Sequence, residues 1–126
     1  MINISVSFAR KSTVDQHLSG AGPALRVINN LEFKGGYTNK QADIEQCRLK
    51  LQNAPDDHQK KIVLVTDGRP SVDKSNQKGG NCQTCIDDAR TEAIYAKKAD
   101  ILLITVGVKD WTFDHAILEQ ISNPGM

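Results

Sequence analysis

Asp67 directly follows a run of apolar, mostly β-branched residues, 62–65, and is itself followed by Gly68. Such a run is typical of a strand in the middle of a parallel sheet that helices cover on both faces. Ligands of parallel α/β sheets bind at the carboxyl ends of the strands. A carboxylate at this point is well placed to hold a cation or a phosphate-bound metal. Asp-Gly is also a common pair in turns, so this segment alone does not decide whether Asp67 is a ligand or a turn residue.

A second oxygen donor, Thr38, follows the pair Gly35-Gly36 and precedes a predicted helix. Its hydroxyl would therefore lie at a helix N-terminus. With Gln41 three residues later, Thr38 also fits a capping box, in which the hydroxyl only satisfies backbone amides. The Gly-Lys-Ser/Thr ending of a nucleotide-binding phosphate loop is absent here, which argues against that class of site.

Cys82 and Cys85 have the spacing of redox and zinc motifs. Zinc needs four ligands, and Cys47 and the three histidines are scattered along the sequence. A redox motif of this kind should follow a strand directly, whereas a long polar loop precedes this one. We therefore favour a local or inter-element disulfide, or a pair of plain thiols, over a metal site.

The elements that must position these residues alternate between strands and helices. Two apolar runs and one stretch of apolar–polar alternation predict strands, and four stretches with apolar residues at helical spacing predict helices. The strands fall at 2–8, 62–65 and 101–108, with a short polar edge strand over 13–18; the helices begin at Pro23, after Thr38, near Cys85, and at a cap on Asp110 or Thr112. This order predicts an α/β fold with a mostly parallel sheet.

The composition excludes several function classes. The chain of 126 residues is predicted to be a single domain, 1–126. Its 16 basic and 15 acidic residues give a net charge of +1, with no basic stripe, which argues against nucleic-acid binding. No apolar run is long enough to cross a membrane. Three cysteines are too few for disulfides to be the main source of stability.

Four segments in the correct order resemble a von Willebrand factor type A domain, and the resemblance covers essentially the whole chain. They are Ile4 to Ala9, Leu31 to Asn39 with Gly-Gly-Tyr-Thr-Asn, Ile62 to Gly68 with Thr-Asp-Gly, and Ala99 to Val108. The resemblance implies a Rossmann-like fold: an open, mostly parallel sheet with helices on both faces. It also implies a non-enzymatic protein-interaction module of the adhesion type, often extracellular or at the cell surface.

The family's metal-ion-dependent adhesion site usually holds Mg²⁺ with a DxSxS loop, a threonine and an aspartate. Carried over by position, the threonine is Thr38 and the aspartate is Asp67. Mg²⁺ prefers hard oxygen ligands, and an open coordination position would accept an acidic side chain of a partner protein. The resemblance further implies ligand-binding roles for the neighbours of these two residues: Gly36, Tyr37, Asn39, Gly68 and Arg69.

The chain departs from the family in one large respect, since it has no DxSxS loop. The nearest string, 73–77, ends in Gln77 and follows the wrong strand. The family places DxSxS on a strand and crossover helix before the segment that begins here at Ile2, and usually closes with a further strand and helix. We therefore expect a partial domain with weak or no metal binding. We also expect an unpaired strand edge and an exposed apolar face. Some members of the family bind their partners without a metal, through other surface loops, and this is a further alternative for the chain.

An α/β enzyme is the alternative from another class. Asp67 could hold Mg²⁺ for phosphoryl transfer or nucleotide chemistry, as strand-end carboxylates do in such enzymes. The missing phosphate loop argues against an enzyme. So does the lack of a second acid or a lysine that the sequence would place near Asp67. Phosphatase or nucleotidase turnover that Asp67→Asn removes would favour this alternative.

Overall fold

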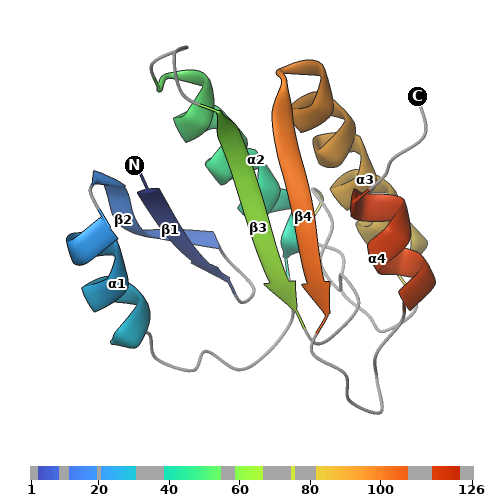
Figure 1. Cartoon of the computed structure of the whole chain (residues 1–126). Helices are drawn as coiled ribbons and strands as arrows, with labels where there is room; N and C mark the ends of the chain where they lie inside the picture. Colours follow the sequence, from blue (N-terminus) through green and yellow to red (C-terminus); the bar gives the residue numbers. More distant parts are fainter. Residues whose placement is uncertain are drawn as a thin grey trace.

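The computed structural model describes residues 3–8, 12–19, 21–30, 39–54, 59–66, 75, 82–107 and 115–122. Within these ranges, strands and helices alternate much as the sequence predicts (Figure 1). In chain order the elements are β1 (Asn3–Phe8), β2 (Ser12–Ser19), α1 (Ala21–Asn29), α2 (Lys40–Gln52), β3 (Lys60–Thr66), α3 (Gln83–Lys98), β4 (Ile101–Gly107) and α4 (His115–Ser122). No helix in the described part of the chain is both long and apolar enough to cross a membrane.

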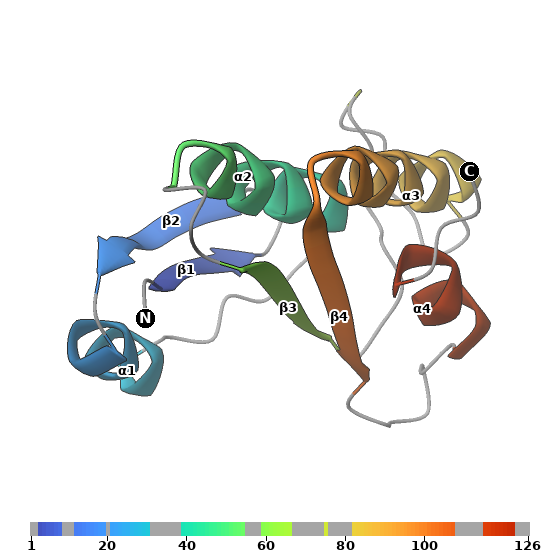
Figure 2. The same ribbon diagram turned by 45° about the horizontal axis from the view of Figure 1, so that its top comes forward.

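The strands β1 and β2 form an antiparallel pair. Their register runs from Asn3 opposite Ser19 to Phe8 opposite Ser12, with irregularities near Ser5 that allow the ribbon to bend. Both α1 and α2 contact this pair. Figure 2 shows the two helices on opposite sides of it, so the β1–β2 pair lies between two layers of helix.

The strands β3 and β4 pair in parallel, from Lys60 opposite Ile101 to Thr66 opposite Gly107. The helix between them in the chain, α3, packs against β4 and lies beside α2 on the same face of the sheet (Figure 2). Because parallel strands point the same way, the carboxyl ends of β3 and β4 meet at one edge. That edge is where a ligand site is expected in an α/β sheet.

In the described part of the chain, a hydrophobic core joins the helix-covered face of β3 and β4 to α2, α3 and α4. The α3 stripe consists of alanines at helical spacing, and these small side chains let the helix lie close to the sheet and to α2. Two lysines end α3, where they suit the negative end of the helix dipole. The core residues are Ile44, Leu51, Ile62, Leu64, Ile86, Ala89, Ala93, Ala96, Ile101, Leu103, Ile117 and Ile121.

The opposite face of β3 and β4 is exposed. Burial alternates along β3, so that Ile62 is 5% exposed and its neighbour Val63 is 57% exposed. Among the described helices, α2, α3 and α4 contribute to the core on one face of this sheet, and α1 packs against β1 and β2. The predicted α/β fold with a parallel sheet is confirmed, while the described helices leave the second face of β3 and β4 exposed. The exposed apolar side chains, here called the bare face, are Val63, Val65, Leu102, Ile104 and Val106.

The four described strands form two separate two-stranded sheets, β1–β2 and β3–β4, where one open sheet was predicted. Figure 1 shows β1 on the side of β3 that faces away from β4, yet no strand ladder joins β1 to β3 among the described residues. Among the described strands, β3 therefore has one paired edge and one unpaired edge. The expected exposed apolar face is present among the described residues, and the described strands form no ladder along the second edge of β3.

Candidate functional site

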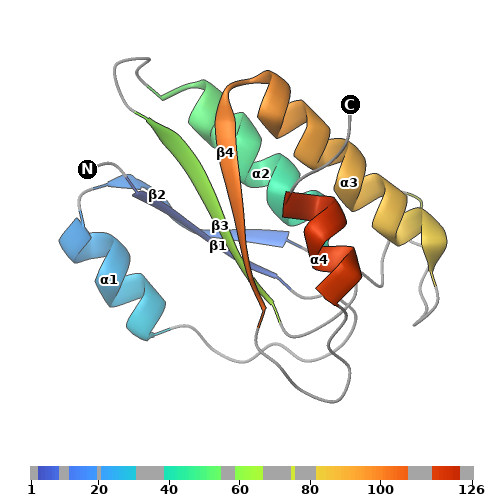
Figure 3. The ribbon, with the colours of Figure 1, turned by 45° about the vertical axis from the view of Figure 1, so that its right-hand side comes forward.

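The candidate site lies at the edge where β3 ends. Thr66 is the last residue of β3 and is buried, and Asp67, Gly68 and Arg69 follow it in the chain, outside the described residues. The helix α2 runs opposite to β3, so its N-terminal turn lies toward the same edge (Figure 3). The sheet and the helix thus bring together two segments that the sequence separates by more than twenty residues.

Asn39 is the N-cap of α2. Its side-chain Oδ1 accepts a hydrogen bond from the Ala42 backbone N–H at 3.2 Å, and its backbone carbonyl accepts one from Asp43 N–H at 3.3 Å. The alternative in which Thr38 caps this helix is therefore wrong, because the next residue holds the cap position. Thr38, Gly36 and Tyr37 lie outside the described residues. The ligand-binding role implied for Asn39 stays a prediction, while the structure gives its Oδ1 a capping role.

The first turn of α2 carries an unusual number of buried polar side chains. Lys40 is 0% exposed, and Asp43 is also buried; both take part in polar or electrostatic interactions. Buried charges need such partners, since removing an ion from water costs several kcal/mol. The Gln41 Oε1 atom is buried without a hydrogen-bond partner among the described residues. This end of the sheet therefore concentrates polar groups that contribute nothing to the apolar core.

Asp43 also acts on Cys47, one turn further along α2. Burial, and then the negative charge of Asp43, raise the pKa of the Cys47 thiol from 9.0 to about 11. The thiol is thus neutral at physiological pH and packs against the core as a small apolar group. Cys47 is consequently a poor candidate for a nucleophile or a metal ligand.

The predicted metal ligands, Thr38 and Asp67, both lie outside the described residues, and of the 73–77 string only Ser75 is described, as an exposed residue. Within the described ranges, no group of three or more His, Cys, Asp or Glu side chains could hold a metal ion. A hydroxyl and a carboxylate are nevertheless the kind of hard oxygen donors that Mg²⁺ accepts while keeping several waters. In chemical type, the predicted donor pair therefore fits Mg²⁺.

A buried ion pair between α2 and α3 holds the two helices in register. Arg48 donates from Nε to Glu92 Oε2 at 3.1 Å, and its Nη2 forms an ion pair with the same oxygen at 3.1 Å. Its guanidinium lies 5.5 Å from the centre of the Tyr95 ring. Sequence reasoning missed this pair. The available signal was the position of Glu92 on the alanine stripe of α3, between Ala89 and Ala96, where a charged residue needs a partner.

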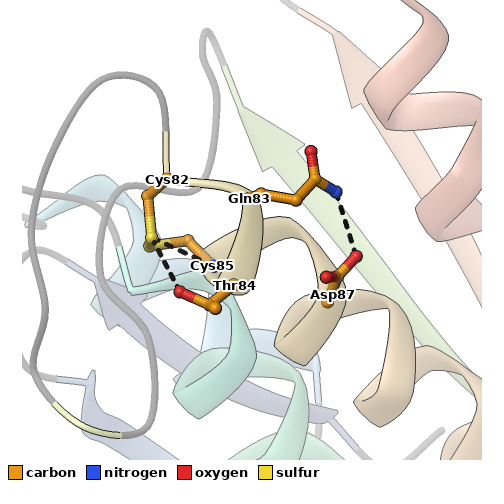
Figure 4. The surroundings of a disulfide bond; sticks show 5 residues. All are labelled: Cys82, Gln83, Thr84, Cys85 and Asp87. Carbon is orange, nitrogen blue, oxygen red and sulfur yellow. Dashed lines mark hydrogen bonds between the residues drawn. A yellow bond between two sulfur atoms is a disulfide. The ribbon is translucent and has the colours of Figure 1, made fainter.

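Cys82 and Cys85 form a disulfide at the start of α3, so the local disulfide is the alternative that the structure contains (Figure 4). Cys82 is the N-cap of the helix, and its Sγ accepts a hydrogen bond from Cys85 N–H at 3.1 Å. The Thr84 hydroxyl lies 3.3 Å from the same sulfur. Cys82 is half-buried, whereas Cys85 is 0% exposed.

A cavity of about 580 Å³ lies at the other end of the β3–β4 sheet, where the strands begin. Two lysines and one aspartate, Lys60, Lys97 and Asp100, contribute to its lining together with Gln59, Ala99, Ile101 and Leu102. Asp100 adopts a positive φ of 59° in the tight turn from α3 into β4. This cavity therefore lies at the end of the sheet opposite the carboxyl edge, and of the predicted site residues that the structure describes, Asn39, Cys82 and Cys85 do not line it.

Comparison with protein families gives one match, to the von Willebrand factor type A domain, over residues 6–126. Comparison with curated protein sequences gives no match. The match covers nearly the whole chain, and the described elements agree with it: a small parallel sheet with helices, in α/β order. The chain therefore belongs to the von Willebrand factor type A family.

Proposed function

We propose that this chain is a protein-interaction module of the adhesion type, which binds its partner at the carboxyl edge of the β3–β4 sheet and does not catalyse a reaction. The observation that carries the proposal is the polar first turn of α2, where Asn39, Lys40, Gln41 and Asp43 are all buried beside that edge. Family membership supports a binding role, because domains of this family typically bind proteins.

Because its side chains are buried, the polar turn would support the binding edge and would not contact the partner itself. Asn39, Lys40 and Asp43 each take part in polar or electrostatic interactions, and buried polar groups that interact with their surroundings are held in a defined arrangement. A prearranged surface loses less entropy when a partner binds. Asn39 adds to this effect, since its cap holds the first turn of α2 in place directly after Thr38.

A divalent cation is the cofactor that we propose for this edge, with Thr38 and Asp67 as the residues that would hold it. When bound, the ion would supply an open coordination position for an acidic side chain of the partner. Two protein ligands make a weak site, so we expect an affinity in the millimolar range or weaker.

Binding of the metal alone tests the proposal most directly. Thermal unfolding is measured with and without Mg²⁺ or Mn²⁺ for the unchanged chain, for Asp67→Asn, and for the matched control Asp100→Asn at the opposite end of the sheet. An ion at ten times its Kd stabilises the folded state by about 1.4 kcal/mol, a shift of about 5 °C in Tm for a domain of this size. We expect this shift in the unchanged chain and the control, and its loss in Asp67→Asn.

Partner binding is tested with a short peptide that contains one glutamate, compared with its glutamine counterpart. Binding of the glutamate peptide that depends on the cation and on Asp67 would support the proposal. A shift in Tm that Asp67→Asn leaves unchanged would contradict the metal site. Hydrolysis of a phosphate monoester that Asp67→Asn abolishes would instead favour the α/β enzyme.

A further inference from the structure

The two sulfurs of the Cys82–Cys85 disulfide differ in access. Cys85 lies inside the first turn of α3 and is 0% exposed, while Cys82 caps the helix and keeps part of its surface in solvent. Figure 4 shows the Cys82 sulfur at the outer end of the helix, beside the Thr84 hydroxyl. An incoming thiolate must approach a disulfide sulfur along the S–S axis, so access decides which sulfur it attacks. Here the accessible sulfur is that of Cys82.

The groups around Cys82 suit a thiolate. Its Sγ accepts the Cys85 N–H at 3.1 Å, and the Thr84 hydroxyl, 3.3 Å away, can donate to the same atom. Two hydrogen-bond donors at a helix N-terminus favour negative charge on the sulfur that they contact. Cys47 provides the contrast within the same chain, because burial and Asp43 hold that thiol neutral.

The disulfide closes a very short loop, since the two cysteines are only three positions apart. A disulfide stabilises a fold mainly by restricting the unfolded chain, and the restriction is smallest for short loops. The helix around it is also held by other contacts, since Ile86, Ala89 and Ala93 are buried in the core. Opening the disulfide should therefore leave α3 and the core in place.

From these observations we propose that Cys82 and Cys85 form a reactive redox pair, which exchanges with dithiols through attack at Cys82, and not a structural staple. The first thiolate of the dithiol bonds to Cys82 Sγ. The Cys82–Cys85 bond breaks, and its electron pair leaves with Cys85 Sγ, which takes a proton from water. The second thiolate of the dithiol then attacks the dithiol's first sulfur, which is bonded to Cys82 Sγ, and Cys82 leaves as a thiolate. The dithiol is oxidised to a disulfide and the chain gains two electrons.

The proposal is tested in a Cys47→Ala background, which leaves only the pair. Two variants, Cys85→Ser and Cys82→Ser, each retain one thiol, and their reaction with an aromatic disulfide reagent is followed at pH 7 by the absorbance of the released thiolate. Circular dichroism confirms that each variant is folded. We expect Cys82, in the Cys85→Ser variant, to react at least tenfold faster than Cys85 in the Cys82→Ser variant. A smaller ratio would overturn the proposal.

A second measurement uses the intact pair and so does not depend on either serine variant. The Cys47→Ala chain is incubated with dithiothreitol at pH 7, free thiols are alkylated at intervals, and their number is read by mass spectrometry. We expect full reduction while the circular dichroism spectrum stays that of the folded chain. With glutathione in place of the dithiol, the mixed disulfide should be found on Cys82. Reduction that occurs only as the chain unfolds, or an adduct found on Cys85, would identify a structural staple.

Discussion

The two faces of the β3–β4 sheet carry similar residues and have opposite environments. Leu103 faces α2, α3 and α4 and is buried, while the next residue, Ile104, lies on the bare face. The β1–β2 pair provides a further contrast, because helices lie on both of its sides (Figure 2). Apolar character therefore does not by itself decide burial in this protein. Burial depends on which face of each pair the helices reach.

The largest effect should separate the two faces directly. Leu103→Ala removes a core side chain and should lower the free energy of unfolding by about 3–4 kcal/mol, from lost burial and the cavity left behind. The matched change on the bare face, Ile104→Ala, should lower it by no more than about 1 kcal/mol, mainly through β-propensity. Chemical denaturation measures both. Equal losses would mean that the bare face is covered in solution.

The Arg48–Glu92 pair joins α2 and α3, two of the helices on the covered face of the sheet. The Glu92 side chain is 1% exposed, so Glu92→Ala leaves the Arg48 charge largely buried and should cost about 3 kcal/mol. The control is Glu119→Ala in α4, whose contact with His115 is 3.8 Å long and whose side chain is 71% exposed. That exposed pair should contribute less than about 0.5 kcal/mol. Similar costs for the two variants would show that α2 and α3 do not rely on the buried pair.

The titration of the Cys47 thiol measures how well the helix-covered face of the β3–β4 sheet excludes water. Its pKa is about 11 in the folded chain and near 9.0 when unfolded, so the unfolded chain loses this proton first as pH rises. The stability that Cys47 contributes is therefore complete below pH 9 and is lost between pH 9 and 11. The loss amounts to at most about 2.7 kcal/mol for two pKa units. Unfolding of the unchanged chain and of Cys47→Ala is compared across this range. A constant difference between them would show that the thiol is not shielded from water.

Substitutions on the bare face should have the smallest effect on stability and a clear effect on solubility. Replacing Val63 and Ile104 with threonine keeps β-branched side chains and should change the free energy of unfolding by about 0.5 kcal/mol or less. Because an exposed apolar face beside an unpaired strand edge promotes association, light scattering should show severalfold less aggregation. The control is Leu25→Thr in α1, an exposed apolar residue away from β3 and β4. If the control helps equally, the bare face is not what drives association.

Much of the fold was predictable because it follows from local patterns. The stripe Ile86, Ala89, Ala93, Ala96 predicts α3 and its buried side, and all of these residues are in the core. The alternation of elements predicts the α/β class, and four motifs in order predict the family. The polar strand predicted at 13–18 is present as β2, one residue longer at each end.

Other features were not predictable, since local patterns leave them open. Thr38 and Asn39 are both good caps, and only the path of the chain into α2 decides that Asn39 accepts the Ala42 N–H. Arg48 and Glu92 are 44 positions apart, so their contact depends on how α2 and α3 pack. Among the candidate site residues, the sequence did not decide whether Cys82 and Cys85 form a disulfide or remain free thiols. In the structure they form a disulfide at the start of α3.

The sequence by itself determined which segments become strands and helices and which of their sides are apolar, because propensity and periodicity act over a few residues. The tertiary structure decided which of two equally apolar faces of β3 and β4 is buried, and among the described strands it forms no ladder between β1 and β3. It also decided that polar groups gather in the first turn of α2 at the carboxyl edge of β3. Burial and pairing depend on contacts between segments far apart in the chain, which the residues of a single segment do not specify.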